Sequence, residues 1–295
     1  MALWIVRMGE SMLKSKPVRR HFTAVLRRSL SAQCELRGAT AKISIEGGLM
    51  FVECEDEDAD ATTDALRHTF GVGAVDPATE QEPTPEAIAE AALAVAGDLA
   101  EGTSFAVRCK RHGNKGQWTS QSFAGATGAA ILERAPHLTV NLSNPDWKVR
   151  VALFPEKARL LGERIHGPGG LPTGVQGLVL AQLRNETDML AAWLVMHRGC
   201  RIQPMEGASA ELLATLSPWD PALAERKWAE KLTTGPGRSN NPQPWGIVGA
   251  ELEGAPTMVA SDDEADIVKT PLSHLEPLIG WSSEDIEALR HTVLS

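Results

Sequence analysis

Apolar and polar positions in the first quarter of the chain follow the order of a small α+β domain. Short apolar or alternating runs bounded by turn residues are typical of β-strands. They occur at residues 3–8, 41–48 (which ends in a Gly-Gly turn) and 49–54. Between the first two runs, Phe22, Leu26 and Leu30 recur at helical spacing, and a second helix ends at Gly71, before a short strand near residues 74–75. This order predicts a ferredoxin-like fold.

A second α+β segment is predicted between two stretches whose composition is typical of linkers. The first linker, residues 76–85, is acidic and contains proline, and the second, residues 167–174, is rich in glycine and proline. Between them the pattern predicts helices at 85–99 and 120–134, a strand at 104–113, and two or three strands with a tight turn near 156–157.

After residue 175 the pattern changes to strands that alternate with helices. Strands are predicted at 177–183, from residue 200, at 245–252 and at 267–272, and helices at 187–197 and within 212–232. A terminal helix is capped by Ser282 or Ser283. This alternation predicts a parallel sheet and an α/β domain.

Composition excludes several classes of protein. The chain has 295 residues, of which 43% are hydrophobic and 23% charged, and a formal net charge of −9. It contains no apolar run of about 18 residues, so we expect no membrane span. Its start lacks the features of a secretory signal, and four scattered cysteines without a CxxC motif fit a reducing compartment, so we expect a cytoplasmic protein.

Charge is distributed in blocks along the chain. Residues 1–48 and 102–170 each carry a net charge of +6, whereas residues 49–101 carry −13 and residues 171–295 carry −8. A polyanion would feel the local field of the two basic blocks, because screening limits electrostatic interactions to about a Debye length. The alternative is that both blocks are ordinary solvated surfaces.

Three groups of motifs, in order along the chain, resemble one family. They include IVRMGESMLKSKPVRRHF (residues 5–22), VNLSNPDWKVRVAL with GPGGLPTG (140–153 and 167–174), and LVMHRGCRI with PLSHLEPLIGWSSEDIEALRHTV (194–202 and 271–293). Together they resemble the tRNA 4-thiouridine synthases, also called tRNA sulfurtransferases. The resemblance implies a ferredoxin-like domain at 1–77, a THUMP domain at 78–168, and a shortened, degenerate PP-loop (HUP-like) α/β domain with a parallel sheet at 175–295.

The resemblance implies that the first two modules bind tRNA at its acceptor end. Basic residues of both modules are candidates for phosphate contacts, and Trp118 is a candidate for stacking on an unpaired base or, equally, for core packing. The candidate RNA-binding residues are Lys14, Lys16, Arg19, Arg20, Arg108, Lys110, Arg111, Lys115 and Trp118. We expect the cationic members to form one continuous positive surface.

The nucleotide-binding loop of the family is replaced in this chain. The family pattern Ser-Gly-Gly-x-Asp-Ser corresponds here to Leu183, Arg184, Asn185, Glu186, Thr187 and Asp188. Glycines in such a loop let backbone N–H groups approach a pyrophosphate, whereas Arg184, Asn185 and Glu186 place side chains in that space. We therefore expect no catalytic residue here and no bound ATP or Mg²⁺.

Sulfur transfer also needs a reactive cysteine or an iron–sulfur cluster. Cys200 is the only cysteine of the third predicted domain, and we expect it to be a buried structural thiol. Cys34, Cys54 and Cys109 lack the spacing of metal ligands, so we expect no metal site.

Two hypotheses about function follow. The first is a tRNA-binding protein that presents tRNA to a partner modification enzyme, or acts as an accessory subunit, with a homodimer as a further arrangement. The alternative is an active ATP-dependent tRNA sulfurtransferase with an atypical nucleotide site. An acidic scaffold without an RNA role would leave the two basic blocks unexplained.

Overall fold

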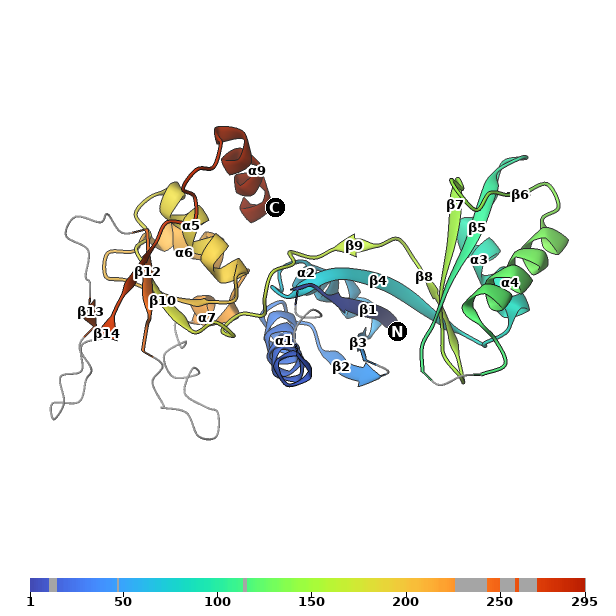
Figure 1. Ribbon diagram of the computed structural model, residues 1–295, viewed down its shortest axis with the longest axis horizontal. Coiled ribbons are helices and arrows are strands. Elements are labelled where there is room, and N and C mark those ends of the chain that lie inside the picture. The colour runs from blue at the N-terminus through green and yellow to red at the C-terminus, as the bar shows by residue number, and fades with distance from the viewer. Residues whose placement is uncertain are drawn as a thin grey trace. The chain divides into compact units, whose positions relative to one another are not determined.

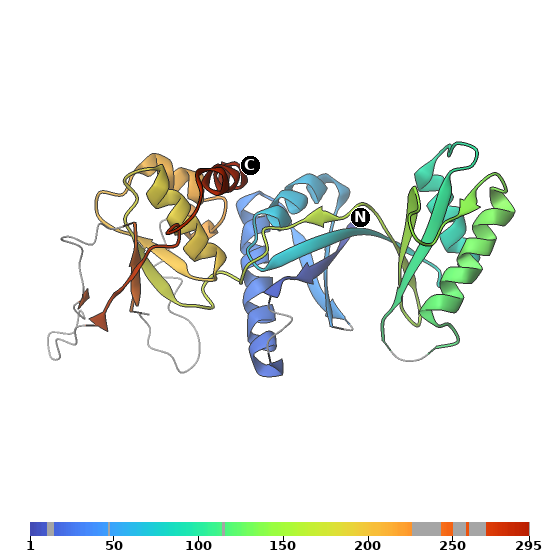
Figure 2. The same cartoon turned by 45° about the horizontal axis from the view of Figure 1, so that its top comes forward.

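The computed structural model of the chain describes residues 1–10, 15–46, 48–113, 116–225, 243–249, 258–259 and 270–294. The chain forms two compact units, which we describe separately (Figures 1 and 2). Unit 1 comprises Met1–Val6, Lys42–Asp56 and Val75–Ile165, and unit 2 comprises Arg7–Ala41, Glu57–Ala74 and His166–Ser295.

Unit 1 is built on a mixed β-sheet. Its strands, in sheet order, are β2 (Ala41–Glu46), β3 (Leu49–Cys54), β1 (Ala2–Met8), β4 (Val72–Gln81), β8 (Ala158–Leu161), β7 (Trp147–Leu153), β5 (Ser104–Arg111) and β6 (Thr139–Val140), with β9 (Ile165–His166) beside β4. Strand β5 is parallel to β6 and β7, whereas β1 with β3, β4 with β8, and β7 with β8 are antiparallel. The strands of both predicted α+β modules therefore belong to one sheet.

The linker predicted at residues 76–85 is wrong for most of its length. Strand β4 runs through Asp76 and Pro77 to Gln81 and pairs with β8. The carbonyl oxygen of Pro77 accepts a hydrogen bond from the backbone N–H of Gly162 (2.8 Å). Acidic and proline residues suggested a loop, but the arginines that neutralise Asp76 lie 74 and 88 positions later in the chain. A local composition pattern cannot show such distant partners.

Helices α3 (Pro85–Ala96) and α4 (Ser120–Arg134) cover one face of β5, β7 and β8. Ile88 of α3 and Phe123 and Ile131 of α4 share a core cluster with Phe105 and Val149 of the strands. All five side chains are at most 2% exposed, so this cluster fixes the position of the sheet against the helices.

Both helices begin where the sequence provides a cap. The Thr84 hydroxyl accepts a hydrogen bond from the backbone N–H of Ala87, and Thr119 and Ser122 form a reciprocal capping box. Helix α3 ends at Ala96, three residues before the end of the predicted helix, and Gly97 follows as its C-cap. The φ angle of Gly97 is 66°, a conformation that favours glycine and stops the helix.

Unit 2 contains two helices from the N-terminal part of the chain and a separate α/β domain. The helices are α1 (Lys16–Leu36) and α2 (Ala59–Arg67), preceded by the 3₁₀ turn η2 (Asp56–Asp58). The second sheet has the order β11 (Arg201–Pro204), β10 (Leu178–Ala181), β12 (Gly246–Val248), β15 (Ser273–Leu275), and all its strands are parallel. The predicted parallel sheet is therefore confirmed.

The remaining elements of unit 2 complete this domain. They are α5 (Glu186–His197), α6 (Ala210–Leu216), α7 (Pro221–Glu225), the antiparallel pair β13 (Met258–Val259) and β14 (Thr270–Pro271), and α9 (Ser283–Leu294). Of the strand predicted at 267–272, residues 267–269 lie outside the described residues and residues 270–271 form β14, whereas edge strand β15 begins at Ser273. The Ser282 hydroxyl accepts a hydrogen bond from the backbone N–H of Asp285 (3.1 Å), which confirms Ser282 as the cap of α9.

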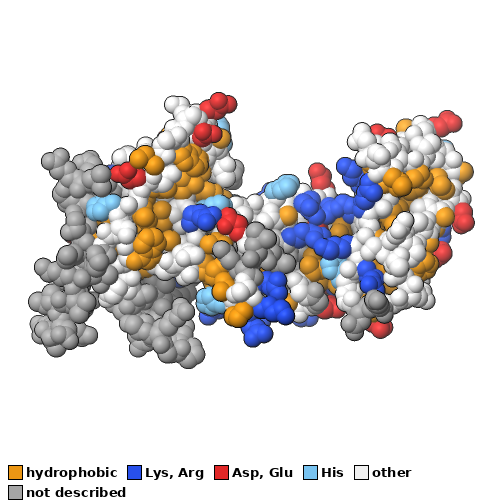
Figure 3. All heavy atoms as spheres, viewed as in Figure 1, with side chains coloured by type: hydrophobic (Ala, Val, Ile, Leu, Met, Phe, Trp, Pro, Cys, Tyr) orange, Lys and Arg blue, Asp and Glu red, His pale blue; other side chains and the backbone are white. Residues whose placement is uncertain are grey.

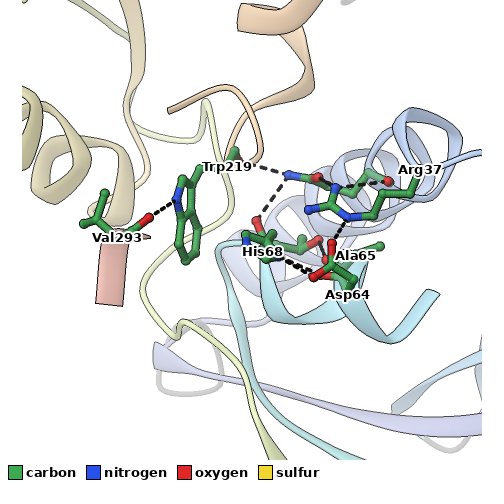
Figure 4. A network of polar contacts seen from close by, with 8 residues as sticks. Arg37, Asp64, Ala65, His68, Trp219 and Val293 are labelled. Atoms are coloured by element: carbon green, nitrogen blue, oxygen red, sulfur yellow. Dashed lines mark hydrogen bonds and ion pairs between the residues drawn. The ribbon is translucent and has the colours of Figure 1, made fainter. Parts of the chain in front are cut away.

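Helices α1 and α2 share a core with the α/β domain. Phe70, just after α2, stacks on Trp219 with ring centroids 5.3 Å apart and 19° between the ring planes. The Gln33 amide donates hydrogen bonds to the backbone carbonyl oxygens of His68 (3.2 Å) and Trp219 (3.1 Å). The Trp219 indole N–H donates to the carbonyl oxygen of Val293 (3.2 Å), as Figure 4 shows. These contacts join α1, α2 and α9 in one packed cluster.

Within the described ranges, no helix is both long enough and apolar enough to span a membrane.

Candidate nucleic-acid interface

Strand β5 presents cations on the face that points away from α3 and α4. Successive side chains of a strand point to opposite faces of a sheet. Phe105 and Val107 are buried in the core on the helix side, so Arg108 and Lys110 belong to the opposite face. Both cations are exposed.

Strand β7 continues this arrangement. Val149 and Val151 are buried on the helix side, so Lys148 and Arg150 belong to the same face as the cations of β5. The parallel register places Arg150 directly opposite Arg108. Like charges in this position are destabilising, so folding stability alone does not favour the pair. We call Arg108, Lys110, Lys148 and Arg150 the cationic face, and Figure 3 shows Lys and Arg side chains gathered beside these strands.

The rest of this side of the sheet is covered. Ala152 and Leu161 pack with Ile5 and Phe51 in a separate apolar cluster. The guanidinium of Arg159, which is 2% exposed, lies 4.2 Å from the centre of the Phe51 ring. These groups do not cover Arg108, Lys110 and Lys148, which are exposed.

A buried carboxylate holds two arginines at the edge of the cationic face. The Asp76 side chain is 0% exposed. Its Oδ1 accepts a hydrogen bond from Nη2 of Arg150, and Arg164 donates from Nε to Oδ1 (2.9 Å) and from Nη2 to Oδ2 (3.2 Å). The hydrogen bond to Asp76 raises the pKa of Arg164, so this guanidinium stays charged.

The structure brings together some of the predicted RNA-binding residues and separates others. Arg108 and Lys110 lie on the cationic face, whereas the position of Arg111 in β5 places it with Phe105 and Val107. Arg111 and Trp118 line a pocket of about 340 Å³, together with Phe154. Trp118 is half-buried and meets the edge of Phe123, with ring centroids 5.6 Å apart, as a packing residue does.

Three of the other predicted residues belong to unit 2. Lys16, Arg19 and Arg20 lie on α1 in unit 2, where Lys16 and Arg20 are exposed. Lys14 and Lys115 lie outside the described residues. The continuous positive surface across both modules stays a prediction.

Three cations of this region were not among the predicted RNA-binding residues. Lys148 and Arg150 occupy the polar positions of the alternating run WKVRVAL, so strand periodicity alone could have found them. Arg164 had no such signal, because its role depends on Asp76, 88 positions earlier in the chain.

The segment that replaces the nucleotide loop is closed by its own side chains. The Asn185 side chain caps α5 by accepting a hydrogen bond from the backbone N–H of Asp188 (2.9 Å). The Asp188 carboxylate accepts the backbone N–H of Arg184 (3.0 Å), and the Arg184 guanidinium donates to the carbonyl oxygen of Gly249 (2.9 Å). Two backbone N–H groups at this helix start, where a phosphate could bind, are thus occupied by side chains of the protein.

Gly249 fits closely against this segment. Its φ angle is 79°, and an added Cβ would lie 2.3 Å from the carbonyl oxygen of Gln182. A larger residue would therefore push this chain segment away from Arg184 and Asp188.

Two of the four thiols, Cys109 and Cys200, show no activation. Cys200 is buried, and burial raises its pKa to about 11. Burial likewise raises the pKa of Cys109 to about 11. At neutral pH both are therefore protonated, the form that is a poor nucleophile and a poor metal ligand. Within the described residues, no three His, Cys, Asp or Glu side chains come together as a metal site would require.

Comparison with known families identifies two domains. A ThiI ferredoxin-like domain matches residues 3–75, and a THUMP domain matches residues 82–161. Both predicted modules of the N-terminal half are thereby confirmed.

The relatives with curated names agree with these matches. A probable tRNA sulfurtransferase of Methanosarcina acetivorans is 34% identical over 208 residues, which are 68% of this chain and 50% of that protein. A probable tRNA sulfurtransferase of Staphylococcus saprophyticus is 30% identical over 202 residues, 68% of this chain and 49% of that protein. The chain thus spans about half the length of these curated relatives.

Two solved structures share the fold. The crystal structure of PH1313 from Pyrococcus horikoshii matches with a TM-score of 0.73 and 22% identity over 99% of both chains. A 4-thiouridine synthetase in complex with RNA and bound ATP matches with a TM-score of 0.69 and 20% identity, over 100% of this chain and 86% of that one. Both likenesses extend over the C-terminal α/β domain.

Proposed function

Because this chain is a THUMP protein related to the tRNA sulfurtransferases, we propose that it binds tRNA through unit 1 and presents it for modification. The cationic face carries the proposal. Four cations on two adjacent strands, with two arginines in direct register, form a surface that a phosphate backbone would neutralise. From the resemblance to the tRNA sulfurtransferases in sequence, we propose the acceptor end as the region bound.

We further propose that the chain does not adenylate tRNA by itself. Asn185 already accepts the backbone N–H of Asp188, and Asp188 accepts that of Arg184. The Arg184 side chain reaches across to the carbonyl oxygen of Gly249. Glu186 and Asp188 pair with Arg290 and Arg184, so a polyphosphate would have to compete with these carboxylates for both cations. No ATP, Mg²⁺ or catalytic cysteine is therefore part of this proposal.

A tRNA-binding protein without its own activation step needs a partner. We propose that a separate modification enzyme with an intact nucleotide loop and reactive cysteines acts on the tRNA that this chain holds. A second copy of the chain would supply neither of these features, because it carries the same replaced loop.

One pair of measurements tests the proposal. Purified protein is titrated with tRNA at low salt, and separately with Mg·ATP by calorimetry. Measurable tRNA affinity without ATP binding supports an accessory tRNA-binding protein. ATP binding at micromolar concentration, with pyrophosphate release on addition of tRNA, would instead support the active sulfurtransferase, and absence of tRNA affinity would refute both.

A further inference from the structure

Two arginines share the single carboxylate of Asp76. One buried carboxylate faces two guanidinium groups, and the register places Arg108 as a third cation opposite Arg150. Among the described residues, Asp76 is the only carboxylate that pairs with Arg150 or Arg164. The local net charge is therefore positive, although the Arg150 side chain is only 22% exposed.

The hydrogen-bond donors of the pair are only partly used. Arg164 donates hydrogen bonds from Nε and Nη2 to Asp76, and its Nη1 has no partner among the described residues. Arg150 donates from Nη2 to Asp76 and from Nη1 to the carbonyl oxygen of Gly162 (3.0 Å). Each nitrogen of a guanidinium fork that carries two hydrogens can make a second bond, and the 40% exposed side chain of Arg164 is open to a ligand.

We infer that Arg150 and Arg164, held in place by Asp76, bind a phosphodiester group of the RNA backbone. This inference rests on the proposed function, which it deepens by naming a site. Guanidinium groups bind phosphate with paired, charge-assisted hydrogen bonds, and a fixed pair loses little conformational entropy on binding. Asp76 is a positioning residue in this site, because its carboxylate acts only through the two arginines.

The surroundings favour a polymer of phosphates over a single free phosphate. Residues two positions apart on a strand lie about 6.5–7 Å apart, so Lys148 with Arg150, and Arg108 with Lys110, form two short rows of cations. A row of charges at this spacing can follow successive phosphates of a nucleic-acid strand, whereas one free phosphate would use the arginine pair alone.

Substitution of Asp76 separates positioning from simple electrostatics. The variant Asp76→Asn removes a negative charge, so a general field effect predicts tighter binding of tRNA. If Asp76 positions the arginines, the same variant binds more weakly despite its additional positive charge. The two explanations thus predict opposite signs for one measured affinity.

The experiment measures tRNA affinity of the full chain against salt concentration for the wild type, Asp76→Asn, Arg164→Gln and Arg164→Lys. Arg134→Gln is the matched control, because Arg134 is an exposed arginine of α4, on the other side of the same sheet. We expect Arg164→Gln to lower affinity roughly tenfold and to reduce the slope of log K against log salt by about 0.7–0.9. We expect Arg164→Lys, which keeps the charge but loses the fork, to bind several-fold more weakly than the wild type, and the control to match the wild type.

Thermal unfolding of each variant shows whether it folds, and Arg164→Lys decides the question if Asp76→Asn does not fold. Wild-type affinity in both Arg164→Lys and Arg164→Gln would overturn the inference while leaving tRNA binding intact. Tighter binding by folded Asp76→Asn would also overturn it. Displacement of tRNA by inorganic phosphate at constant ionic strength would assign the pair to free phosphate instead. Failure of the wild type to bind tRNA at low salt would be a failure of the proposed function itself.

Discussion

The carboxylate of Asp188 accepts a hydrogen bond from the backbone N–H of Arg184 at 3.0 Å. This contact closes the start of α5 from inside the protein. A phosphate bound at this position would have to displace the carboxylate and the Asn185 cap, and the Arg184 side chain would have to move away from Gly249. These contacts stabilise the start of α5 in a conformation that disfavours nucleotide binding.

We therefore predict that Mg·ATP produces no binding heat at micromolar concentrations in calorimetry. Asn185→Ala should lower the free energy of unfolding by about 1 kcal/mol, because it removes a helix cap, and should leave the result with ATP unchanged. Saturable ATP binding by the wild type would show that the segment can open.

The aromatic cluster of unit 2 should be a major source of its stability. Phe70 is 1% exposed and contacts Trp193 and Trp219, each with ring centroids 5.3 Å away. We expect Phe70→Ala to lower the free energy of unfolding by about 3–5 kcal/mol, measured by urea denaturation. The control Val95→Ala removes a side chain that is 76% exposed and should change stability by less than about 0.5 kcal/mol. Similar effects of the two variants would contradict this packing account.

The half-buried His197 should make stability depend on pH. Burial lowers its pKa, although the hydrogen bond to the carbonyl oxygen of Pro168 (2.9 Å) acts in the opposite direction. A lowered pKa in the folded state favours the neutral ring, so this contribution is complete above the unfolded-state pKa of about 6.5 and is lost as pH falls through the folded-state value.

Unfolding measurements between about pH 5 and pH 7 check this dependence. We expect the wild type to lose stability towards low pH more steeply than His197→Gln. His291→Gln is the control, since the His291 side chain is 79% exposed on α9. Equal pH slopes for the wild type and His197→Gln would contradict the expected role of His197.

Side-chain periodicity predicted most helices and strands because each depends on the pattern of apolar and polar residues within its own segment. The alternating runs of β5 and β7 and the parallel strands after residue 175 need only the side-chain pattern of each segment. Only the start of β4, near residues 74–75, was predicted. The rest was missed because Asp76 and Pro77 are typical of loops, whereas the groups that pair with them, Arg150, Arg164 and Gly162, lie far along the chain.

The candidate site, like the fold, could be predicted from the sequence only in part. Arg108 and Lys110 were found from a basic block, but a block does not distinguish the two faces of a strand, so Arg111 was included and Lys148 was not. Contacts such as that of Gln33 with Trp219, 186 positions apart, depend on tertiary packing that no local pattern contains.

The cationic face should determine the salt dependence of tRNA binding. Each cation that neutralises a phosphate releases counterions, which contributes about 0.7–0.9 to the slope of log K against log salt. Lys110 and Lys148 are exposed and do not support the core, so the double variant Lys110→Gln/Lys148→Gln should fold normally. The matched control is Lys42→Gln/Arg134→Gln, which makes the same change in net charge with exposed residues outside the cationic face.

The most direct test of tRNA binding through unit 1 is the affinity of the wild type and these two double variants for tRNA across a range of salt concentrations. We predict that Lys110→Gln/Lys148→Gln weakens binding and reduces the slope by about 1.4–1.8, whereas Lys42→Gln/Arg134→Gln retains the wild-type slope. Equal slopes for all three proteins, or no tRNA binding by the wild type at low salt, would contradict the account.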